Sequence, residues 1–315
     1  MNTSIKDAEI GIIVDAGPGM GYGHAVRSLR LARALSKRNK VLVYPLSQPC
    51  TEFMDGFGVE TRPAPGTAGE SFPPLVITDL REGHGITAAI HRNGSRHISI
   101  HDLGLAQCHS DVAIDGSITR LFPYGADKNR KLFLGPQYMI TRDSVPRTNP
   151  CKTVLVTLGG GSTAQFAESV SNQLARLGLT TVTTRGFAGR ASLSDAEFAA
   201  AMSNCCFAIS ASGVTLYDLL ASGVPTIALA VDRVQLRTAA AFHELGAVLC
   251  GGLVERFSPS SLLRCCREML ENQPLVQRIS QAGQTIVDGK GLSRVVEIVR
   301  RQLWLTSQQK TFSPC

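Results

Sequence analysis

Gly17-Pro-Gly-Met-Gly-Tyr-Gly-His-Ala-Val-Arg27 is the stretch of this sequence that decides its fold. The apolar run Ile10-Gly-Ile-Ile-Val14 precedes it, and helical spacing of apolar residues follows from Ala25 to Leu35. This order predicts a strand, a tight turn and a helix. Such a turn brings backbone N–H groups and a helix N-terminus to one point, which suits a pyrophosphate. His24 stands where the helix begins, so the stretch also predicts chemistry beside the phosphate.

A turn of this kind has three other interpretations. A tight turn with a surface histidine remains open. A nicotinamide site needs an acidic residue after the second strand, but no carboxylate follows Pro45 before Glu52. A P-loop needs Gly-Lys-Ser or Gly-Lys-Thr after the glycines, and neither is present. The sequence therefore argues against the second and third interpretations.

Composition limits the class of protein. The chain has 315 residues, of which 43% are hydrophobic, and this is enough for two α/β domains. Aromatic residues make up only 6%, which argues against a nucleic-acid stacking surface. The net charge of +7 is spread along the chain and favours anionic substrates. Nine cysteines without metal or disulfide spacing, no signal peptide and no long apolar stretch favour a cytoplasmic protein without a membrane span.

The pattern of strand, glycine turn and helix occurs twice along the chain. Strands are predicted at 10–15, 40–45, 75–79, 96–101, 112–115, 153–158, 180–184, 207–211 and 225–229, and helices lie between them. The segment 142–150 contains two prolines and is the best candidate for a linker. The expected domains are 1–145 and 151–306, both Rossmann-like and doubly wound, with a tail at 307–315. Their ligand is expected beyond the carboxyl ends of the strands, in a cleft between the domains.

Further candidate binding residues lie in the second half. Gly160, Gly161 and Ser162 form a second glycine turn, and Ser212-Gly213 forms another before a helix. Their N–H groups would hold a diphosphate. Thr215 and Asp218 are spaced as a capping box, yet Asp218 is also placed to bind a ribose diol. Gln235 is expected at the cleft edge, where it would bind sugar hydroxyls.

Several motifs together resemble a known family. The first is Gly21-Tyr-Gly23-His-Ala-Val-Arg27-Ser-Leu-Arg-Leu-Ala32, and Leu134-Gly-Pro-Gln-Tyr138 with Arg142 is the second. The others are Leu158-Gly-Gly-Gly-Ser162, Ile209 to Asp218, Gly223-Val-Pro225, Gln235, and Asp288-Gly-Lys-Gly291 with Arg294. The set is similar to the UDP-sugar hydrolase of pseudaminic acid biosynthesis and its spore-coat polysaccharide relatives (the PseG/SpsG family). It resembles the MurG-type glycosyltransferases more distantly.

The resemblance implies a GT-B fold in which the C-terminal domain holds most of a UDP-sugar. It implies that His24 is the base that activates water. Independently of the resemblance, Asp79 and Asp102 are expected at neighbouring strand ends, and either is a candidate to orient His24. The transferases usually have Glu where Asp218 stands, and the hydrolases commonly have an aromatic residue near Arg81 and Asn in place of Val234. These last two departures concern the sugar pocket.

The expected function is hydrolysis of a UDP-sugar by inverting attack of water at the anomeric carbon, in surface-glycan biosynthesis. An inverting glycosyltransferase with a hydroxyl acceptor is the first alternative, and a nucleotide-sugar-binding protein without activity is the second. No metal, organic cofactor or nucleic-acid partner is expected. His24 is the expected catalytic residue. The expected substrate-binding residues are Gly21, Gly23, Arg27, Gly160, Gly161, Ser162, Ser212, Gly213, Thr215, Asp218 and Gln235.

Overall fold

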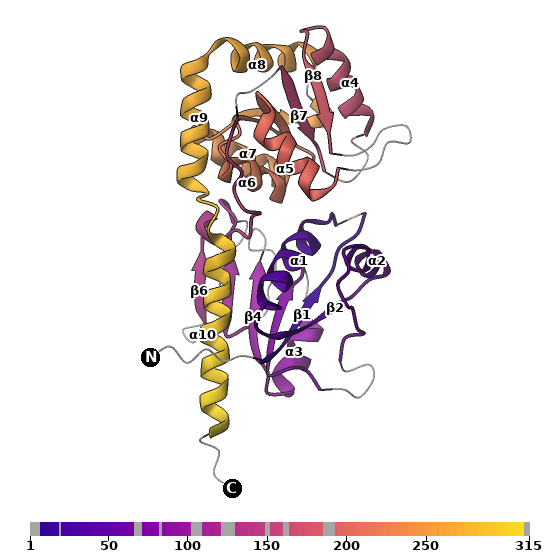
Figure 1. The fold of residues 1–315 in the computed structure, drawn as a ribbon, viewed down its shortest axis with the longest axis vertical. Coiled ribbons are helices and arrows are strands. Elements are labelled where there is room, and N and C mark those ends of the chain that lie inside the picture. The colour runs from indigo at the N-terminus through magenta and orange to yellow at the C-terminus, as the bar shows by residue number, and fades with distance from the viewer. Residues whose placement is uncertain are drawn as a thin grey trace. The chain divides into compact units, whose positions relative to one another are not determined.

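The computed structural model describes residues 7–18, 20–65, 71–81, 84–101, 109–120, 130–148, 152–159, 164–184, 193–256 and 258–311. Contacts along the chain divide it into two units. Unit 1 comprises Met1–Ile140 and Lys290–Cys315, and unit 2 comprises Thr141–Gly289. Each unit has its own parallel sheet with helices packed against it (Figure 1).

Unit 1 is built on a six-stranded sheet in the order β2-β1-β3-β4-β5-β6, and all the neighbouring strands are parallel. Its strands are β1 (Glu9–Val14), β2 (Lys40–Pro45), β3 (Leu75–Asp79), β4 (Arg96–His101), β5 (Val112–Asp115) and β6 (Lys131–Leu134). The central strands are rich in Ile and Val and are buried on both faces, as expected for a parallel sheet.

Helices cover both faces of this sheet. Residues of α1 (Gly23–Leu35), α2 (Gln48–Gly56) and α10 (Gly291–Thr311) share one core with one face of the sheet. Residues of α3 (His84–Arg92) pack in a separate core on the other face. A short 3-10 helix, η1 (Pro136–Tyr138), follows β6. Unit 1 is therefore doubly wound.

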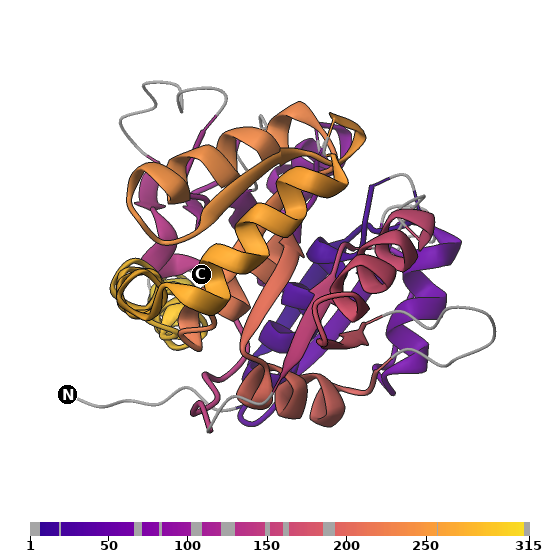
Figure 2. The same ribbon diagram turned by 90° about the horizontal axis from the view of Figure 1, so that it is seen from above.

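Unit 2 repeats this plan with a five-stranded parallel sheet in the order β11-β10-β9-β7-β8. Its strands are β7 (Thr153–Thr157), β8 (Thr180–Thr183), β9 (Phe207–Ala211), β10 (Thr226–Ala230) and β11 (Leu249–Leu253). Its helices are α4 (Ala164–Ala175), α5 (Asp195–Asn204), α6 (Val214–Ala221), α7 (Arg233–Glu244), α8 (Pro259–Glu271) and α9 (Gln273–Ile286), with the 3-10 helix η2 (Val254–Arg256). Helices α4, α8 and α9 share one core with the sheet, and α5 and α6 share another. Figure 2 shows the same ribbon seen from above.

The strand order places a switch point in each unit. In unit 1 the chain moves from β1 outward to β2 and then returns to β3 on the other side of β1. In unit 2 the same reversal separates β7 from β9. Loops that leave adjacent strands in opposite directions open a crevice at the carboxyl ends, which is where ligands of such folds bind. The residues that follow β1, β3, β7 and β9 are therefore the expected ligand-binding positions.

The predicted strands are confirmed to within one residue at each end, and the expected domain division differs at three places. Residues 141–148 are not a free linker, because hydrogen bonds from Arg142, Val145 and Arg147 attach them to unit 2. Residues 290–306 belong to unit 1 rather than to the C-terminal domain. Helix α10 continues to Thr311, so most of the expected tail is helical.

The sequence does not predict two edge strands, β6 and β11, since β6 is short and β11 contains Gly251-Gly252.

Candidate active site

The glycine turn after β1 has the predicted strand–turn–helix order. Gly21 adopts a φ of 86°, which favours glycine, and α1 begins at Gly23. The N–H groups of Gly17, Met20 and Gly21 donate to carbonyls within the turn and are not directed at a ligand. Tyr22 is the N-cap of α1 and its side chain makes no capping bond. The open N–H groups are thus those of the first turn of α1, where His24 lies.

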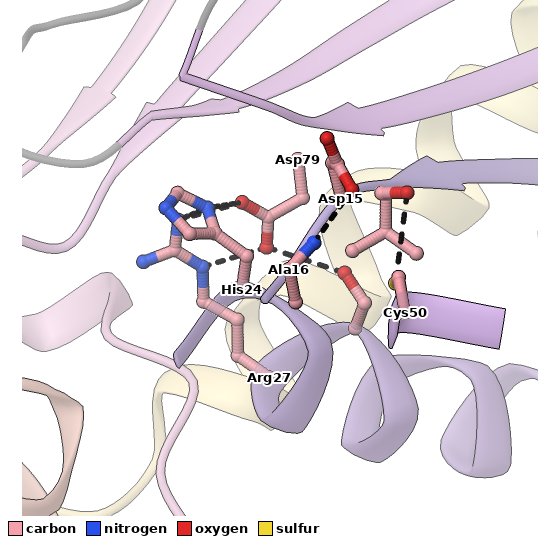
Figure 3. A network of polar contacts seen from close by, with 8 residues as sticks. Asp15, Ala16, His24, Arg27, Cys50 and Asp79 are labelled. Carbon is pink, nitrogen blue, oxygen red and sulfur yellow. Dashed lines mark hydrogen bonds and ion pairs between the residues drawn. The ribbon is translucent and has the colours of Figure 1, made fainter. Parts of the chain in front are cut away.

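The imidazole of His24 is held by a carboxylate from the neighbouring switch-point strand. Asp79 is the last residue of β3 and pairs in register with Val14 of β1. The Nδ1 atom of His24 lies 2.6 Å from Oδ1 of Asp79, and both side chains are buried. Figure 3 shows the two groups turned toward each other. Of the two candidates for the orienting residue, Asp79 occupies that position, while Asp102 lies outside the described residues.

Arg27 has a different place from the one expected of a phosphate ligand. It lies one turn after His24 on α1 and is only 1% exposed. Its Nε donates to Oδ2 of Asp79 and its Nη2 donates to Oδ1, both at 2.6 Å. The hydroxyl of Ser28 adds a bond to Oδ2 at 3.2 Å. The guanidinium therefore holds the carboxylate in a two-pronged pair and is not turned to solvent.

This cluster keeps Asp79 ionised. Burial by itself would raise the pKa of Asp79, but the charges of Arg27 and His24 and their hydrogen bonds outweigh it and hold the pKa below its usual range. A carboxylate only accepts hydrogen bonds, so the 2.6 Å contact with Oδ1 of Asp79 favours the tautomer of neutral His24 that has its proton on Nδ1 and its lone pair on Nε2. The arrangement can orient a general base whose active atom is Nε2.

An open hollow of about 410 Å³ lies at the same edge of the sheet. Asp15 follows β1, Ser47 follows β2, and Arg81 follows β3, so three strand ends contribute to it. The full lining is Asp15, Ala16, Gly17, Pro18, Met20, Ser47, Pro49 and Arg81. Oδ1 of Asp15 accepts hydrogen bonds from the Ala16 N–H and the Ser47 hydroxyl. The walls are mostly apolar, with one acidic and one basic side chain.

In unit 2 the turn between β9 and α6 differs in detail from the prediction. The N-cap of α6 is Gly213, and no side chain caps this helix. Thr215 lies inside the first turn, so the predicted capping box with Asp218 is wrong. The Ser212 hydroxyl donates to the Leu229 carbonyl, and the Ser212 N–H donates to Oε1 of Gln235. Both groups of Ser212 thus stabilise the turn, whereas Gly213 and Thr215 are half-exposed at the helix start.

Asp218 is buried and is turned toward the segment that enters unit 2. Its Oδ1 accepts a hydrogen bond from the main-chain N–H of Arg142 at 2.9 Å, and its Oδ2 lies 3.7 Å from Nε of Arg142. The Arg142 guanidinium also pairs with Asp195 and lies over the Phe198 ring. A carboxylate that is 2% exposed and engaged in this way is not presented to a ribose, which corrects the expected role of Asp218.

The other candidates of unit 2 fall into two groups. Gln235 lies in the first turn of α7, whose N-cap is Asp232. The side-chain oxygen of Gln235 accepts hydrogen bonds from the N–H groups of Ser212 and Val231. This leaves the amide NH2 of Gln235 as its donor group toward a ligand. Gly160, Gly161 and Ser162 lie outside the described residues, and their role stays a prediction.

Two of the motifs that resemble the family, 134–138 and 288–294, pack against each other. A Cβ on Gly291 would overlap the carbonyl of Met139, and Nη1 of Arg294 donates to the Gln137 carbonyl at 2.9 Å. A Cβ on Gly116, directly after β5, would overlap the same Met139 backbone. The start of α10 thus packs against the segment after β6. Sequence order alone does not reveal this contact, because about 150 residues lie between the blocks.

The three buried cysteines among the described residues are poor nucleophiles. Burial raises the pKa of the Cys50 and Cys266 thiols to about 12 and that of Cys205 to about 11. Cys50, in α2, is drawn beside Ala16 in Figure 3, and its thiol donates to the Val14 carbonyl. A thiolate is the reactive form of cysteine, so these thiols remain unreactive near neutral pH.

No protein-family model matches the chain. The chain is 24% identical to the spore coat polysaccharide biosynthesis protein SpsG of Bacillus subtilis, over 92% of this chain and 97% of that protein. The crystal structure of Acinetobacter baumannii MurG has a TM-score of 0.63 at 12% identity, covering 93% of this chain and 99% of that one. The co-structure of S. aureus MnaA with UDP has a TM-score of 0.64 at 13% identity, covering 95% and 97%.

These likenesses confirm two predictions. The resemblance to the spore-coat relatives extends over most of the chain. The two Rossmann-like units are those of the GT-B fold, which MurG-type structures share. Among the helices that the structure describes, none has the length and apolar character required to cross a bilayer.

Proposed function

We propose that the chain is a nucleotide-sugar enzyme that hydrolyses a UDP-sugar at its anomeric carbon, with His24 as the general base. The observation that carries the proposal is the 2.6 Å contact between Nδ1 of His24 and Oδ1 of Asp79 at the switch point of unit 1. A buried carboxylate that fixes the ring tautomer is the usual support of a histidine base. The likeness to SpsG and to a UDP-bound MnaA structure supports the substrate class.

The proposed step balances without a cofactor. Nε2 of His24 takes a proton from water as the water oxygen bonds to the anomeric carbon. The bond from that carbon to the phosphate oxygen breaks, and its electron pair leaves with UDP. Attack from the face opposite the leaving group inverts the configuration. Asp79 orients the ring and stabilises its charged form but takes no proton itself.

The diphosphate is assigned to unit 2. The uncapped start of α6 presents N–H groups and the positive end of the helix dipole, with half-exposed Gly213 and Thr215 beside it. The amide NH2 of Gln235 is a further donor. Gly160, Gly161 and Ser162 would contribute from the adjacent turn after β7. Asp218 is left out of this site because it is engaged with Arg142.

The hollow in unit 1 favours a second candidate function. An open space of about 410 Å³ with apolar walls accommodates more than a water molecule. If a hydroxyl compound occupies it, the same base would activate that hydroxyl and the chain would be an inverting glycosyltransferase. The donor site, the base and the bond that breaks are the same in both candidates. They differ only in the attacking oxygen.

One experiment separates the candidates. The protein is incubated with a panel of UDP-sugars, with and without hydroxyl acceptors, and UDP release is measured. Release without an acceptor indicates the hydrolase, and release only with an acceptor indicates the transferase. Binding of UDP-sugar without any UDP release would contradict both and indicate a binding protein.

The base is tested with a matched pair of variants. His24→Asn removes Nε2 in a buried site, and His109→Asn changes an exposed histidine of the same unit. We expect His24→Asn to lower kcat by at least about 100-fold while UDP binding changes little. His109→Asn should retain normal turnover. Near-normal turnover of His24→Asn would show that His24 is not the base.

A further inference from the structure

Arg27 is a buried cation beside the proposed base. Its side chain is 1% exposed, and Asp79, its partner, is fully buried. The guanidinium meets both carboxylate oxygens, each at 2.6 Å. Its Nη2 also lies 2.9 Å from Nδ1 of His24. Because Arg27 contacts both His24 and Asp79, it can set their positions and their combined charge without touching a substrate.

Arg27 gives the cluster of His24, Arg27 and Asp79 one more positive charge than a histidine–carboxylate pair has. In a simple pair, a protonated imidazole faces an uncompensated carboxylate and the two charges cancel. Here the guanidinium already cancels the carboxylate of Asp79. When His24 takes a proton, the imidazolium therefore forms beside a second cation and the buried cluster becomes positive.

Other titratable groups near the cluster do not change this balance. Burial lowers the pKa of His101, on β4, to about 4, so this imidazole is neutral near pH 7. Burial raises the pKa of Cys50, on α2, to about 12, so this thiol keeps its proton. Asp15, in the turn after β1, is a further acidic group among the described residues, and its Oδ1 is engaged by Ala16 and Ser47. Arg130 is a further cation that acts on His101. The compensating charge on Asp79 is thus that of Arg27.

We propose that Arg27 is a positioning residue that holds Asp79 for His24 and sets the charge of the base, so that proton uptake makes the site cationic. This inference rests on the proposed function. The cluster gains one positive charge in the same step in which the departing diphosphate gains one negative charge. Arg27 thereby favours the reaction through His24, although it lies too deep to bind the phosphate itself.

The test changes the positive charge of residue 27 and its two-pronged pairing with Asp79 in separate variants. Arg27→Met and Arg27→Gln remove the charge, and Arg27→Lys keeps the charge but cannot bond both carboxylate oxygens. Arg33→Met, at an exposed position of the same helix, is the control. The first readout is the pH dependence of kcat and KM for UDP release. The second is titration of the His24 ring by NMR of protein with ¹⁵N-labelled histidine, assigned with His24→Asn.

In Arg27→Met and Arg27→Gln we expect the acid limb of the kcat profile to move to higher pH by at least about one unit, and the His24 titration to move with it. Near pH 7, kcat should fall at least about tenfold and recover at higher pH, with KM changed less than about threefold. Arg27→Lys should keep the position of the acid limb and lose kcat at every pH. Arg33→Met should match the unmodified protein.

Several outcomes would overturn the proposal. One is a loss of kcat in Arg27→Met and Arg27→Gln that is uniform across pH with an unmoved His24 titration, which indicates only a structural role. Another is an imidazole with its proton on Nε2 in the unmodified protein, a measurement that needs no variant to fold. If no UDP-sugar releases UDP, the proposed function fails, yet the NMR titration still decides the role of Arg27.

Discussion

Oδ1 of Asp79 lies 2.6 Å from Nδ1 of His24, although 55 positions separate the two residues in the chain. The contact exists because β3 lies beside β1 in the sheet, so the residue that closes β3 meets the helix that follows β1. Four donor contacts converge on this one carboxylate. Asp79 therefore serves the stability of unit 1 as well as the proposed base.

Asp79→Asn should destabilise unit 1 far more than His24→Asn does. The first change leaves the Arg27 charge buried without its counter-charge, which costs about 3–5 kcal/mol of unfolding free energy. The second change replaces one neutral group by another and should cost about 1 kcal/mol. Urea unfolding followed by fluorescence of Trp304 measures unit 1, since this is the single tryptophan of the chain and lies on α10. Equal stability of the two variants would contradict the ion pair.

Unit 1 should lose stability in mild acid because of two buried histidines. Burial lowers the pKa of His97 and of His101 to about 4, whereas the unfolded residue titrates near 6.5. Below about pH 6.5 the unfolded chain takes up protons that the folded chain does not accept until about pH 4. The stability from these groups is therefore complete above pH 6.5 and is lost as the pH falls toward 4.

The size of this effect can be measured with the same fluorescence. Each histidine should contribute a slope of up to about 1.4 kcal/mol per pH unit between pH 6 and 4.5. His97→Gln should remove roughly half of the total slope, and His109→Asn, at an exposed position, should leave it unchanged. A slope that is the same in His97→Gln and in the unmodified protein would show that His97 is not a neutral buried group.

Asp218→Ala should weaken unit 2 and leave UDP affinity nearly unchanged. Its carboxylate holds the Arg142 N–H and lies beside the Arg142 guanidinium, so its loss leaves buried donors without an acceptor and should cost about 2–4 kcal/mol. Thr215→Ala, in the same helix, should do the reverse, with weaker UDP binding and normal stability. Calorimetric unfolding and titration with UDP separate these effects. Lost UDP binding in a stable Asp218→Ala protein would restore the ribose role.

Gly291→Ala should destabilise unit 1 by about 1–3 kcal/mol or more. The added methyl group would overlap the backbone of Met139 at the start of α10, and neither backbone can move freely. Gly85→Ala is the control, because it lies in helix α3 with no atom near its Cβ position. That change should be neutral or stabilising by up to about 1 kcal/mol. A normal Trp304 unfolding curve for Gly291→Ala would show that the contact is loose.

The sequence predicted the elements of the fold better than the roles of the side chains. Strand positions follow from short β-branched runs between glycine and proline residues, and these runs are local signals. The role of Arg27 could not be predicted in this way, since a helix position one turn after His24 is compatible with either a phosphate ligand or a buried pair. Asp218 is a similar case, because only the structure brings Arg142 to it.

The amino-acid order by itself determined two Rossmann-like units, the glycine turn and the helix start that holds His24, because these depend on neighbouring residues and on hydrophobic periodicity. Tertiary structure alone decided which carboxylate meets His24, that Arg27 faces inward, and that α10 belongs to unit 1. Those choices depend on strand order and on packing between distant segments. A buried charge is stable only where a partner from another element reaches it, and no local pattern specifies that partner.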